Sequence, residues 1–154
     1  MSLSPGDAAP DFDLPADEGR VSLAGLKGKT VVLYFYPKDD TSGCTSEAQG
    51  FTAAADDFGK AGAVVVGVSK DSVASHAKFR AKYDLNVLLG SAKDDDMVER
   101  YGAWVEKSLY GRKYMGIDRS TYLIDKTGVI RSVWRKVKVP GHVAEVLKAA
   151  QELV

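Results

Sequence analysis

The sequence has a single cysteine, only two histidines and no excess of either charge, and each shortage excludes something. One cysteine cannot form a disulfide within the chain, so we expect a reducing compartment, the cytoplasm. One cysteine and two histidines are too few for a structural zinc site, and we expect neither a metal nor a cofactor. The 21 basic and 21 acidic side chains cancel, which argues against nucleic acid or an anionic membrane as a partner.

Long hydrophobic stretches are also missing. The densest apolar run, residues 63–68, has the length of a strand and falls far short of the roughly 20 residues that a membrane helix needs. The first ten residues lack the charged and then apolar pattern of a secretory signal. The 154 residues contain no repeat and no linker, so we expect one domain over residues 1–154.

Apolar runs alternate with amphipathic patterns along the chain. Strands are predicted by the apolar runs at 31–36, 63–68, 86–89, 121–124 and 129–134. The last two flank Asp125-Lys126-Thr127-Gly128, which predicts a hairpin with Gly at the position that needs a positive φ. Helices are predicted by 3.6-residue periodicity at 48–58, 73–83, 97–101 and 143–150. This order predicts an α/β protein with a thioredoxin-like fold, in which helices cover both faces of a central mixed sheet.

The segment from Tyr34 to Phe51 carries the most chemical information. A buried strand ends at Pro37, and Cys44 then falls in the first turn of the next predicted helix. Unpaired backbone N–H groups at a helix start stabilise negative charge, so this position favours a reactive thiolate. An inert core cysteine is the alternative, but the neighbouring Ser, Gly and Thr residues favour reactivity. Taken alone, Thr41 is explained as a helix cap and Pro37 as the end of a strand.

Other catalytic motifs are absent from the sequence. Position 47 is Glu, so there is no Cys-x-x-Cys motif, and dithiol chemistry of the thioredoxin type is excluded. His76 and His142 lie on predicted helices or at their starts, and we interpret both as surface or packing residues. Basic and apolar residues alternate over 131–138, which a half-exposed strand explains without a ligand.

Two separated motifs carry a family resemblance. Pro37-x-x-x-Thr41-x-x-Cys44 resembles the active-site motif of the peroxiredoxins, and its longer context resembles the Q-type subgroup, also called bacterioferritin comigratory proteins. The stretch 101–125 is similar to the one that carries the active-site arginine of that family, which falls on Arg119. The similarity covers nearly the whole chain, with both motifs in the right order.

The resemblance implies a thioredoxin fold and the reduction of hydrogen peroxide and organic hydroperoxides. By resemblance, Cys44 is the peroxidatic nucleophile, and Thr41 hydrogen-bonds the peroxide and helps to hold the thiolate. Arg119 would stabilise the thiolate and polarise the peroxide, and Pro37 would shield the pocket from water. Arginine suits this role because it keeps its charge and offers several donors, although the residue alone would be explained as a surface residue paired with an acid.

The chain departs from this family in having no resolving cysteine. The two positions that carry it in Q-type members align with Gln49 and Arg80. This predicts a one-cysteine mechanism, in which Cys44 becomes a sulfenic acid and an external thiol, from thioredoxin or from glutathione with glutaredoxin, regenerates it. We expect a monomer, with a dimer as the alternative.

Two other functions remain as alternatives. One is a redox sensor or chaperone without turnover, and the other is a thiol-dependent transferase or reductase that acts on mixed disulfides. Thr41 and Arg119 argue against both, because neither function needs a pair of residues that polarises a peroxide.

Overall fold

The structure is a computed structural model that describes residues 3–153. Its centre is a seven-stranded mixed sheet with the strand order β2-β1-β5-β4-β3-β8-β9. The strands of this sheet are β1 (Asp13–Ala16), β2 (Gly19–Ser22), β3 (Thr30–Phe35), β4 (Ala63–Ser69), β5 (Leu88–Ser91), β8 (Ser120–Ile124) and β9 (Ile130–Trp134). The helices are η1 (Ala24–Leu26), α1 (Ser42–Ala53), α2 (Ala55–Lys60), α3 (Val73–Tyr83), α4 (Met97–Arg100) and α5 (His142–Glu152).

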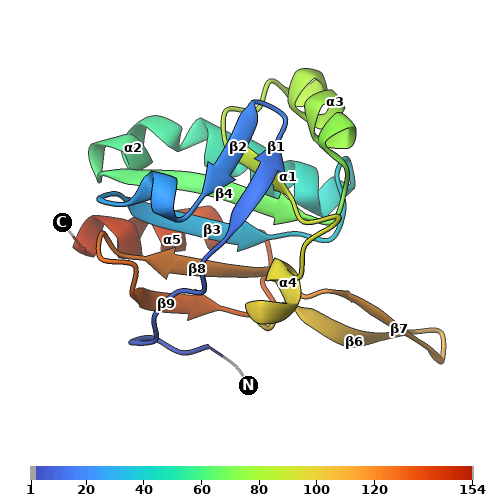
Figure 1. The fold of residues 1–154 in the computed structure, drawn as a ribbon. Coiled ribbons are helices and arrows are strands. Elements are labelled where there is room, and N and C mark those ends of the chain that lie inside the picture. The colour runs from blue at the N-terminus through green and yellow to red at the C-terminus, as the bar shows by residue number, and fades with distance from the viewer. Residues whose placement is uncertain (1–2, 154) are drawn as a thin grey trace.

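Two further strands, β6 (Trp104–Leu109) and β7 (Arg112–Ile117), pair only with each other. They form a hairpin that projects from the body of the molecule, on the side to which β3 and β4 point (Figure 1). None of the helices in residues 3–153 is long and apolar enough to cross a membrane.

Strand β3 pairs with β4 on one side and with β8 on the other, and this pairing positions the ends of both neighbours. Strand β3 runs parallel to β4 and antiparallel to β8, and all six of its residues are buried. Because β8 runs the opposite way, its first residue pairs with the last residue of β3, as Ser120 does with Phe35. The residue before Ser120 is Arg119, so the register brings it to the carboxyl end of β3, where α1 begins.

Side chains of β3 alternate between two hydrophobic cores, one on each face of the sheet. Leu33 packs into a core with Met97 of α4 and the N-terminal segment. Tyr34 packs into the other core, with Phe51 of α1 and Phe79 of α3. Helices therefore cover both faces of the central sheet. Each fully buried large side chain in these cores contributes about 1.5–3 kcal/mol to folding.

Most predicted elements are confirmed, with shifts at their ends. The strand predicted at 86–89 lies at 88–91, and the helix predicted at 48–58 is two helices that meet at Ala54. Gly128 has the expected positive φ. The strands of β1–β2 and β6–β7 were not predicted, because β1 and β2 have only four residues each and β6–β7 is too exposed to show a strong apolar pattern.

Candidate active site

Cys44 lies in the first turn of α1, as the sequence predicted. The helix begins after Thr41, whose carbonyl accepts the first helical hydrogen bond from Thr45 N at 2.8 Å. The N–H groups before Thr45 have no carbonyl within the helix to bond, so they stabilise negative charge at this end. Only 1% of Cys44 is exposed, and its side chain packs into the core under α1.

Arg119 joins Cys44 to a buried carboxylate. Its Nη2 lies 3.3 Å from Cys44 Sγ, and its Nη1 donates to Glu47 Oε1 at 2.6 Å. Cys44 and Glu47 are three residues apart on α1 and therefore share one face of the helix. One guanidinium can bond both of them because its donors are arranged in a planar fork. Sequence reasoning noted Glu47 only as a missing cysteine and did not assign it a role.

Burial and charge act in opposite directions on this group. Burial raises the pKa of Glu47 to about 7, although Arg119 acts to lower it. Burial also acts to lower the pKa of Arg119, but Glu47 and Cys44 outweigh it, so the pKa lies above its ordinary value. Glu47 Oε2 is buried and has no hydrogen-bond partner among the described residues. The guanidinium thus stays charged, while its carboxylate partner is only partly ionised near neutral pH.

Backbone contacts on both sides hold Arg119 in place. Asp118 N donates to Ala103 O at 2.7 Å, and Val137 N donates to Arg119 O at 2.9 Å. Gly43 leaves room for the guanidinium, because a Cβ at this position would lie 3.1 Å from Nη2 of Arg119. A glycine next to the cysteine therefore allows the charged group to approach the start of the helix closely.

Thr41 and Pro37 are exposed on the loop that leads into α1. Thr41 stands at the N-cap position, but its hydroxyl donates to Lys38 O at 2.9 Å and does not cap the helix. The structure therefore brings Arg119 to Cys44, keeps Thr41 at the adjoining helix end with its hydroxyl turned to the loop, and leaves Pro37 at the surface. The roles of Thr41 and Pro37 in binding the peroxide and excluding water stay predictions.

A buried polar cluster anchors this loop, and no pattern in the sequence indicated it. The carboxylate of Asp39 accepts from Tyr36 Oη at 2.6 Å and from Ser75 Oγ at 2.8 Å, and it lies 2.7 Å from His76 Nδ1. Asp39 N donates to Asp71 Oδ2 at 2.8 Å. The loop before Cys44 is thereby bonded to α3 and to the segment that follows β4.

His76 is completely buried, so it is a packing residue and not a surface residue. Its Nδ1 faces the carboxylate of Asp39 and its Nε2 lies 3.0 Å from Gly90 O. Both partners are acceptors, so both ring nitrogens need a proton, which only the imidazolium form provides. Burial acts to lower the pKa of His76, but its bonds to Asp39 and Gly90 outweigh this and raise the pKa.

The pKa of His142 is shifted in the opposite direction from that of His76. Its Nε2 lies 2.8 Å from the hydroxyl of Thr121, and burial lowers its pKa. A neutral histidine among aromatic rings at the start of α5 agrees with the predicted packing role.

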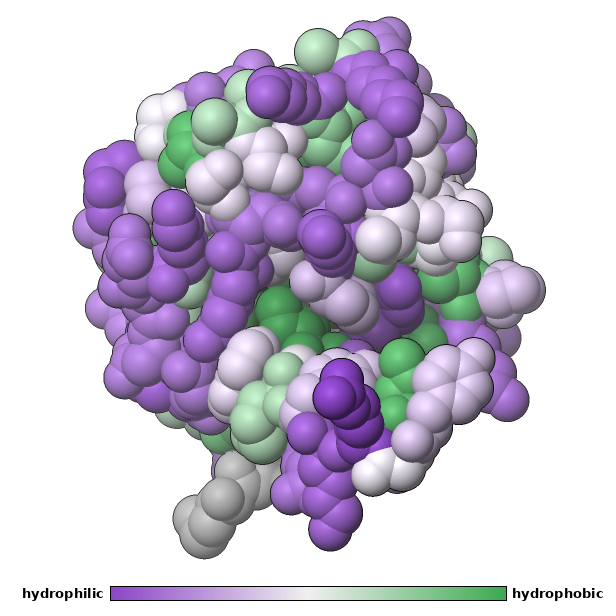
Figure 2. All heavy atoms as spheres, turned by 90° about the vertical axis from the view of Figure 1, so that its right-hand side faces the viewer, coloured by the Kyte–Doolittle hydropathy of each residue, from purple (hydrophilic) through white to green (hydrophobic). Residues whose placement is uncertain are grey.

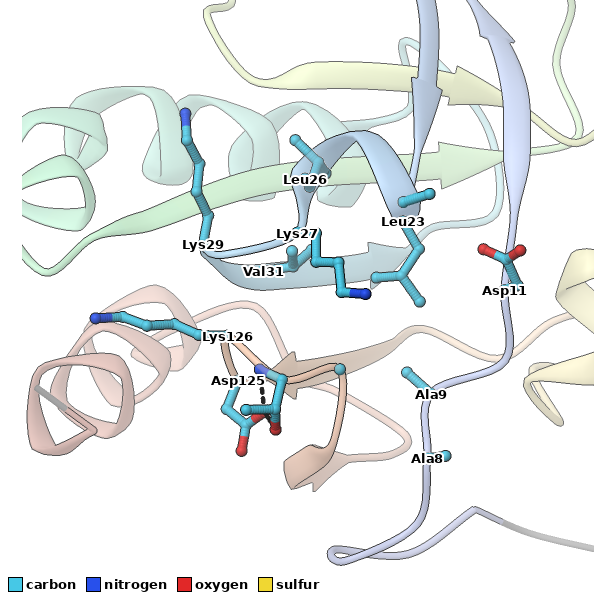
Figure 3. A pocket seen from close by; sticks show the side chains of 13 residues that line it. Ala8, Ala9, Asp11, Leu23, Leu26, Lys27, Lys29, Val31, Asp125 and Lys126 are labelled. Carbon is cyan, nitrogen blue, oxygen red and sulfur yellow. Dashed lines mark hydrogen bonds between the residues drawn. The ribbon is translucent and has the colours of Figure 1, made fainter.

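A cavity of about 350 Å³ lies at the other end of the sheet, where β3 begins. Its wall includes Leu26, Lys27 and Val31, and the hairpin loop at Asp125 and Lys126 closes one side (Figure 3). It contains no cysteine and none of the residues bonded to Arg119, so it is separate from the site at Cys44. Figure 2 views the molecule from the opposite end of the sheet, where β3 and β4 end. A hydrophobic recess lies near the centre of this view. Residues 3–153 hold no group of three or more His, Cys, Asp or Glu side chains placed to bind a metal ion.

Comparisons with known proteins identify the family of this chain. Residues 5–133 match the model of the AhpC/TSA family. The putative peroxiredoxin bcp of Coxiella burnetii is 57% identical over 148 residues, which is 96% of this chain and 98% of the relative. Peroxiredoxin Bcp of Bacillus subtilis is 46% identical over 154 residues, covering 99% of this chain and 98% of the relative.

A solved structure of the bacterioferritin comigratory protein of Xanthomonas campestris superposes with a TM-score of 0.89. It is 39% identical, and the match covers 96% of this chain and 99% of that one. The predicted thioredoxin-like fold is therefore confirmed. The chain belongs to the AhpC/TSA family, as a thiol-dependent peroxidase of the peroxiredoxin Bcp, or peroxiredoxin Q, group.

Proposed function

We propose that this peroxiredoxin reduces hydroperoxides with Cys44 as its only redox-active sulfur, in a one-cysteine mechanism that an external thiol completes. One observation carries the proposal: the charged guanidinium of Arg119 lies 3.3 Å from the sulfur of the only cysteine in the chain. A cation at this distance, together with the start of α1, stabilises the thiolate that attacks the peroxide.

In the first step, the Cys44 thiolate attacks the terminal oxygen of the hydroperoxide. A sulfur–oxygen bond forms while the oxygen–oxygen bond breaks, and its electron pair leaves with the alkoxide, or hydroxide when the substrate is hydrogen peroxide. The leaving oxygen takes up a proton and departs as alcohol or water, and Cys44 becomes a sulfenic acid. Donors aimed at the leaving oxygen, where negative charge develops, lower the barrier.

Arg119 is suited to this role because its fork keeps one donor on the sulfur side while Glu47 holds the other. Thr41 is proposed to turn its hydroxyl from Lys38 O to the bound peroxide, a rotation that its exposed position allows. Pro37, at the surface of the same loop, is proposed to limit access of water to the sulfur.

In the second step, an external thiol must remove the oxygen. Arg80 stands at one of the two positions that align with a resolving cysteine. It bonds Asp17 and the carbonyls of Leu85 and Val87, so this position has a structural role and supplies no thiol. Gln49, at the other such position, is an exposed residue of α1. We propose thioredoxin, or glutathione with glutaredoxin, as the reductant.

The remaining assignments follow from the same chemistry. A single thiol that must return to its reduced form suits a reducing compartment, so we assign the protein to the cytoplasm. We propose that it acts as a monomer, with a dimer as the alternative, and without nucleic acid or membrane partners. Organic hydroperoxides are proposed as substrates beside hydrogen peroxide, since the Xanthomonas campestris relative is described by its alkyl peroxide reduction activity.

Mass spectrometry after one equivalent of hydrogen peroxide tests this function. We expect a gain of one oxygen on Cys44, trapped by a dimedone-type reagent, and no gain in Cys44→Ser. With excess thiol and peroxide, the wild type should turn over many times and Cys44→Ser should not. Consumption of a single equivalent under every reductant would support the redox sensor instead. Activity on glutathionylated substrates with none on peroxides would support the mixed-disulfide reductase.

A further inference from the structure

The β6–β7 hairpin exposes an unusual group of hydrophobic side chains. Within residues 3–153, the large hydrophobic side chains that are exposed all lie on it: Leu109, Tyr110, Tyr114 and Met115. Single exposed hydrophobics are common on protein surfaces, but a cluster on one projecting element marks an interaction site. Aromatic residues and methionine are also enriched at protein interfaces.

The tip of the hairpin keeps its tyrosine in an unfavourable backbone conformation. Leu109 pairs with Arg112, so Tyr110 and Gly111 alone form the turn, and both have a positive φ, of 51° and 78°. Such a turn favours Asn-Gly, since a bulky residue at positive φ is strained. Tyr110 is nonetheless 97% exposed, so the ring gains no burial within the described chain that would offset the strain. A contact with another molecule would bury the ring and offset this strain.

The base of the hairpin adjoins the active site along the chain. At its base, the ammonium of Lys70 lies 4.1 Å from the ring centroid of Trp104, and Ile117 is buried. Ile117 precedes Arg119 by two residues, so the chain that leaves the hairpin leads directly to the group that contacts Cys44. The hairpin also projects on the side where β3 and α1 meet (Figure 1).

The charges of the hairpin indicate what it contacts. Three basic side chains accompany one acidic one: Lys107, Arg112 and Lys113 against Glu106. Lys113 lies 3.6 Å from Glu106 and is partly neutralised, which leaves two positive charges, of which Arg112 adjoins the exposed aromatic tip and Lys107 lies farther along β6. A basic and aromatic surface complements a partner that presents acidic and apolar side chains.

We propose that the β6–β7 hairpin is the docking surface for the protein dithiol that reduces Cys44, a partner with acidic and apolar side chains around its attacking cysteine. The inference rests on the one-cysteine mechanism, because a chain with one cysteine needs an external thiol close to Cys44 in every catalytic cycle. A single hairpin offers a small interface, which suits a partner that must dissociate after each turnover.

The docked partner carries out a two-electron reduction. Its thiolate attacks the sulfur of the Cys44 sulfenic acid, and the hydroxide leaves as water after taking up a proton, which gives a mixed disulfide. The second thiolate of the partner then attacks the partner's own sulfur in that bond. The partner leaves as a disulfide and Cys44 leaves as a thiolate.

The test compares reductants in two hairpin variants, Tyr110→Asn and Arg112→Glu. Asn suits the positive φ of the turn, so Tyr110→Asn removes the ring without straining the hairpin. With a bacterial thioredoxin as the probe, we expect kcat/KM for thioredoxin to fall about tenfold or more in each variant. Turnover with dithiothreitol, and oxidation of Cys44 by hydrogen peroxide, should stay within about twofold of wild type, because neither needs the hairpin. Added salt should slow the wild type but affect Arg112→Glu less.

Lys126→Glu is the matched control. It makes the same charge change on an exposed turn of the β8–β9 hairpin, at the opposite end of the molecule, and should leave all three rates unchanged. In a mixed disulfide of Cys44 with a thioredoxin that lacks its second cysteine, hydrogen exchange should slow over residues 105–116.

Several outcomes would contradict the docking role of the hairpin without contradicting the peroxidase activity. Unchanged thioredoxin kinetics in both variants would do so. So would wild-type turnover with dithiothreitol but with neither thioredoxin nor glutaredoxin. A dimer in wild type that Tyr110→Asn dissolves would assign the hairpin to a second copy of the chain. Selective slowing of Cys44 oxidation by cumene hydroperoxide would assign it to the substrate. Failure of Cys44 to react with any peroxide would instead remove the proposed function itself.

Discussion

The loop before Cys44 and the β6–β7 hairpin before Arg119 lead to the two groups that meet in the site, and they are built in opposite ways. The loop is short and polar, and the buried carboxylate of Asp39 bonds it to three side chains. The hairpin makes few contacts beyond its base and exposes its largest side chains. A site that must hold a thiolate needs fixed geometry, whereas a surface that must bind and release a partner needs exposed groups.

Arg119→Gln should slow the oxidation of Cys44 by hydrogen peroxide by about 10²–10³-fold, because it removes the charge and one donor from the reacting oxygen. Arg119→Lys should recover part of the rate, since it restores the charge but not the fork. Stopped-flow measurement of the oxidation rate gives both values. Arg112→Gln on the hairpin is the control and should change the rate less than about twofold. An equal loss in both arginine variants would contradict the contrast between site and hairpin.

Asp39→Asn should lower the free energy of unfolding by about 2–3 kcal/mol, because it takes the charged partner from His76. The folded pKa of His76 lies above its ordinary value of 6.5. Its contribution is therefore complete below pH 6.5 and is lost as the pH rises through the folded value. Denaturant unfolding at several pH values should show the largest difference from wild type in acid.

Asp40→Asn is the neighbouring control for this variant. Asp40 is exposed and bonds to Lys82 and Tyr83 at the surface, so its loss should change stability little. A difference between Asp39→Asn and wild type that grows toward alkaline pH would rule out the charged His76.

Glu47→Gln should change how stability depends on pH. The pKa of Glu47 is raised from 4.5 to about 7 in the folded protein, so the folded state holds a proton that the unfolded state has released. Wild-type stability should therefore fall as the pH rises from about 4.5 to about 7, by at most about 1.4 kcal/mol per pH unit. The variant should lack this slope, which unfolding curves across the range would measure. Glu145→Gln, at an exposed position of α5, should keep it.

Tyr110→Asn should have the smallest effect and the opposite sign. Asn tolerates the positive φ of the turn, so the variant should be more stable than wild type by up to about 1 kcal/mol. Thermal unfolding measures the change, and Tyr110→Phe, which keeps the strain, should show none of the gain. A loss of stability on Tyr110→Asn would mean that the ring makes a contact within the folded chain.

Sequence and structure each explain a different part of the site. The first-turn position of Cys44 could be predicted because helix starts and buried strands leave local patterns within a few residues. Gln49 and Arg80 were identified as the positions without a resolving cysteine only through the family resemblance. Arg119 was found only through the family resemblance, since 75 residues separate it from Cys44. The bond between Asp39 and His76, 37 residues apart, left no signal at all.

The amino-acid sequence by itself determined the order of the longer helices and of the strands β3, β4, β5, β8 and β9, the single redox-active sulfur and the absence of any internal disulfide partner. The tertiary structure decided which distant groups surround that sulfur. The antiparallel register of β3 and β8 brings Arg119 to the start of α1, and packing buries Glu47 deeply enough to raise its pKa. These properties depend on contacts between segments far apart in the chain, where periodicity and local propensity carry no information.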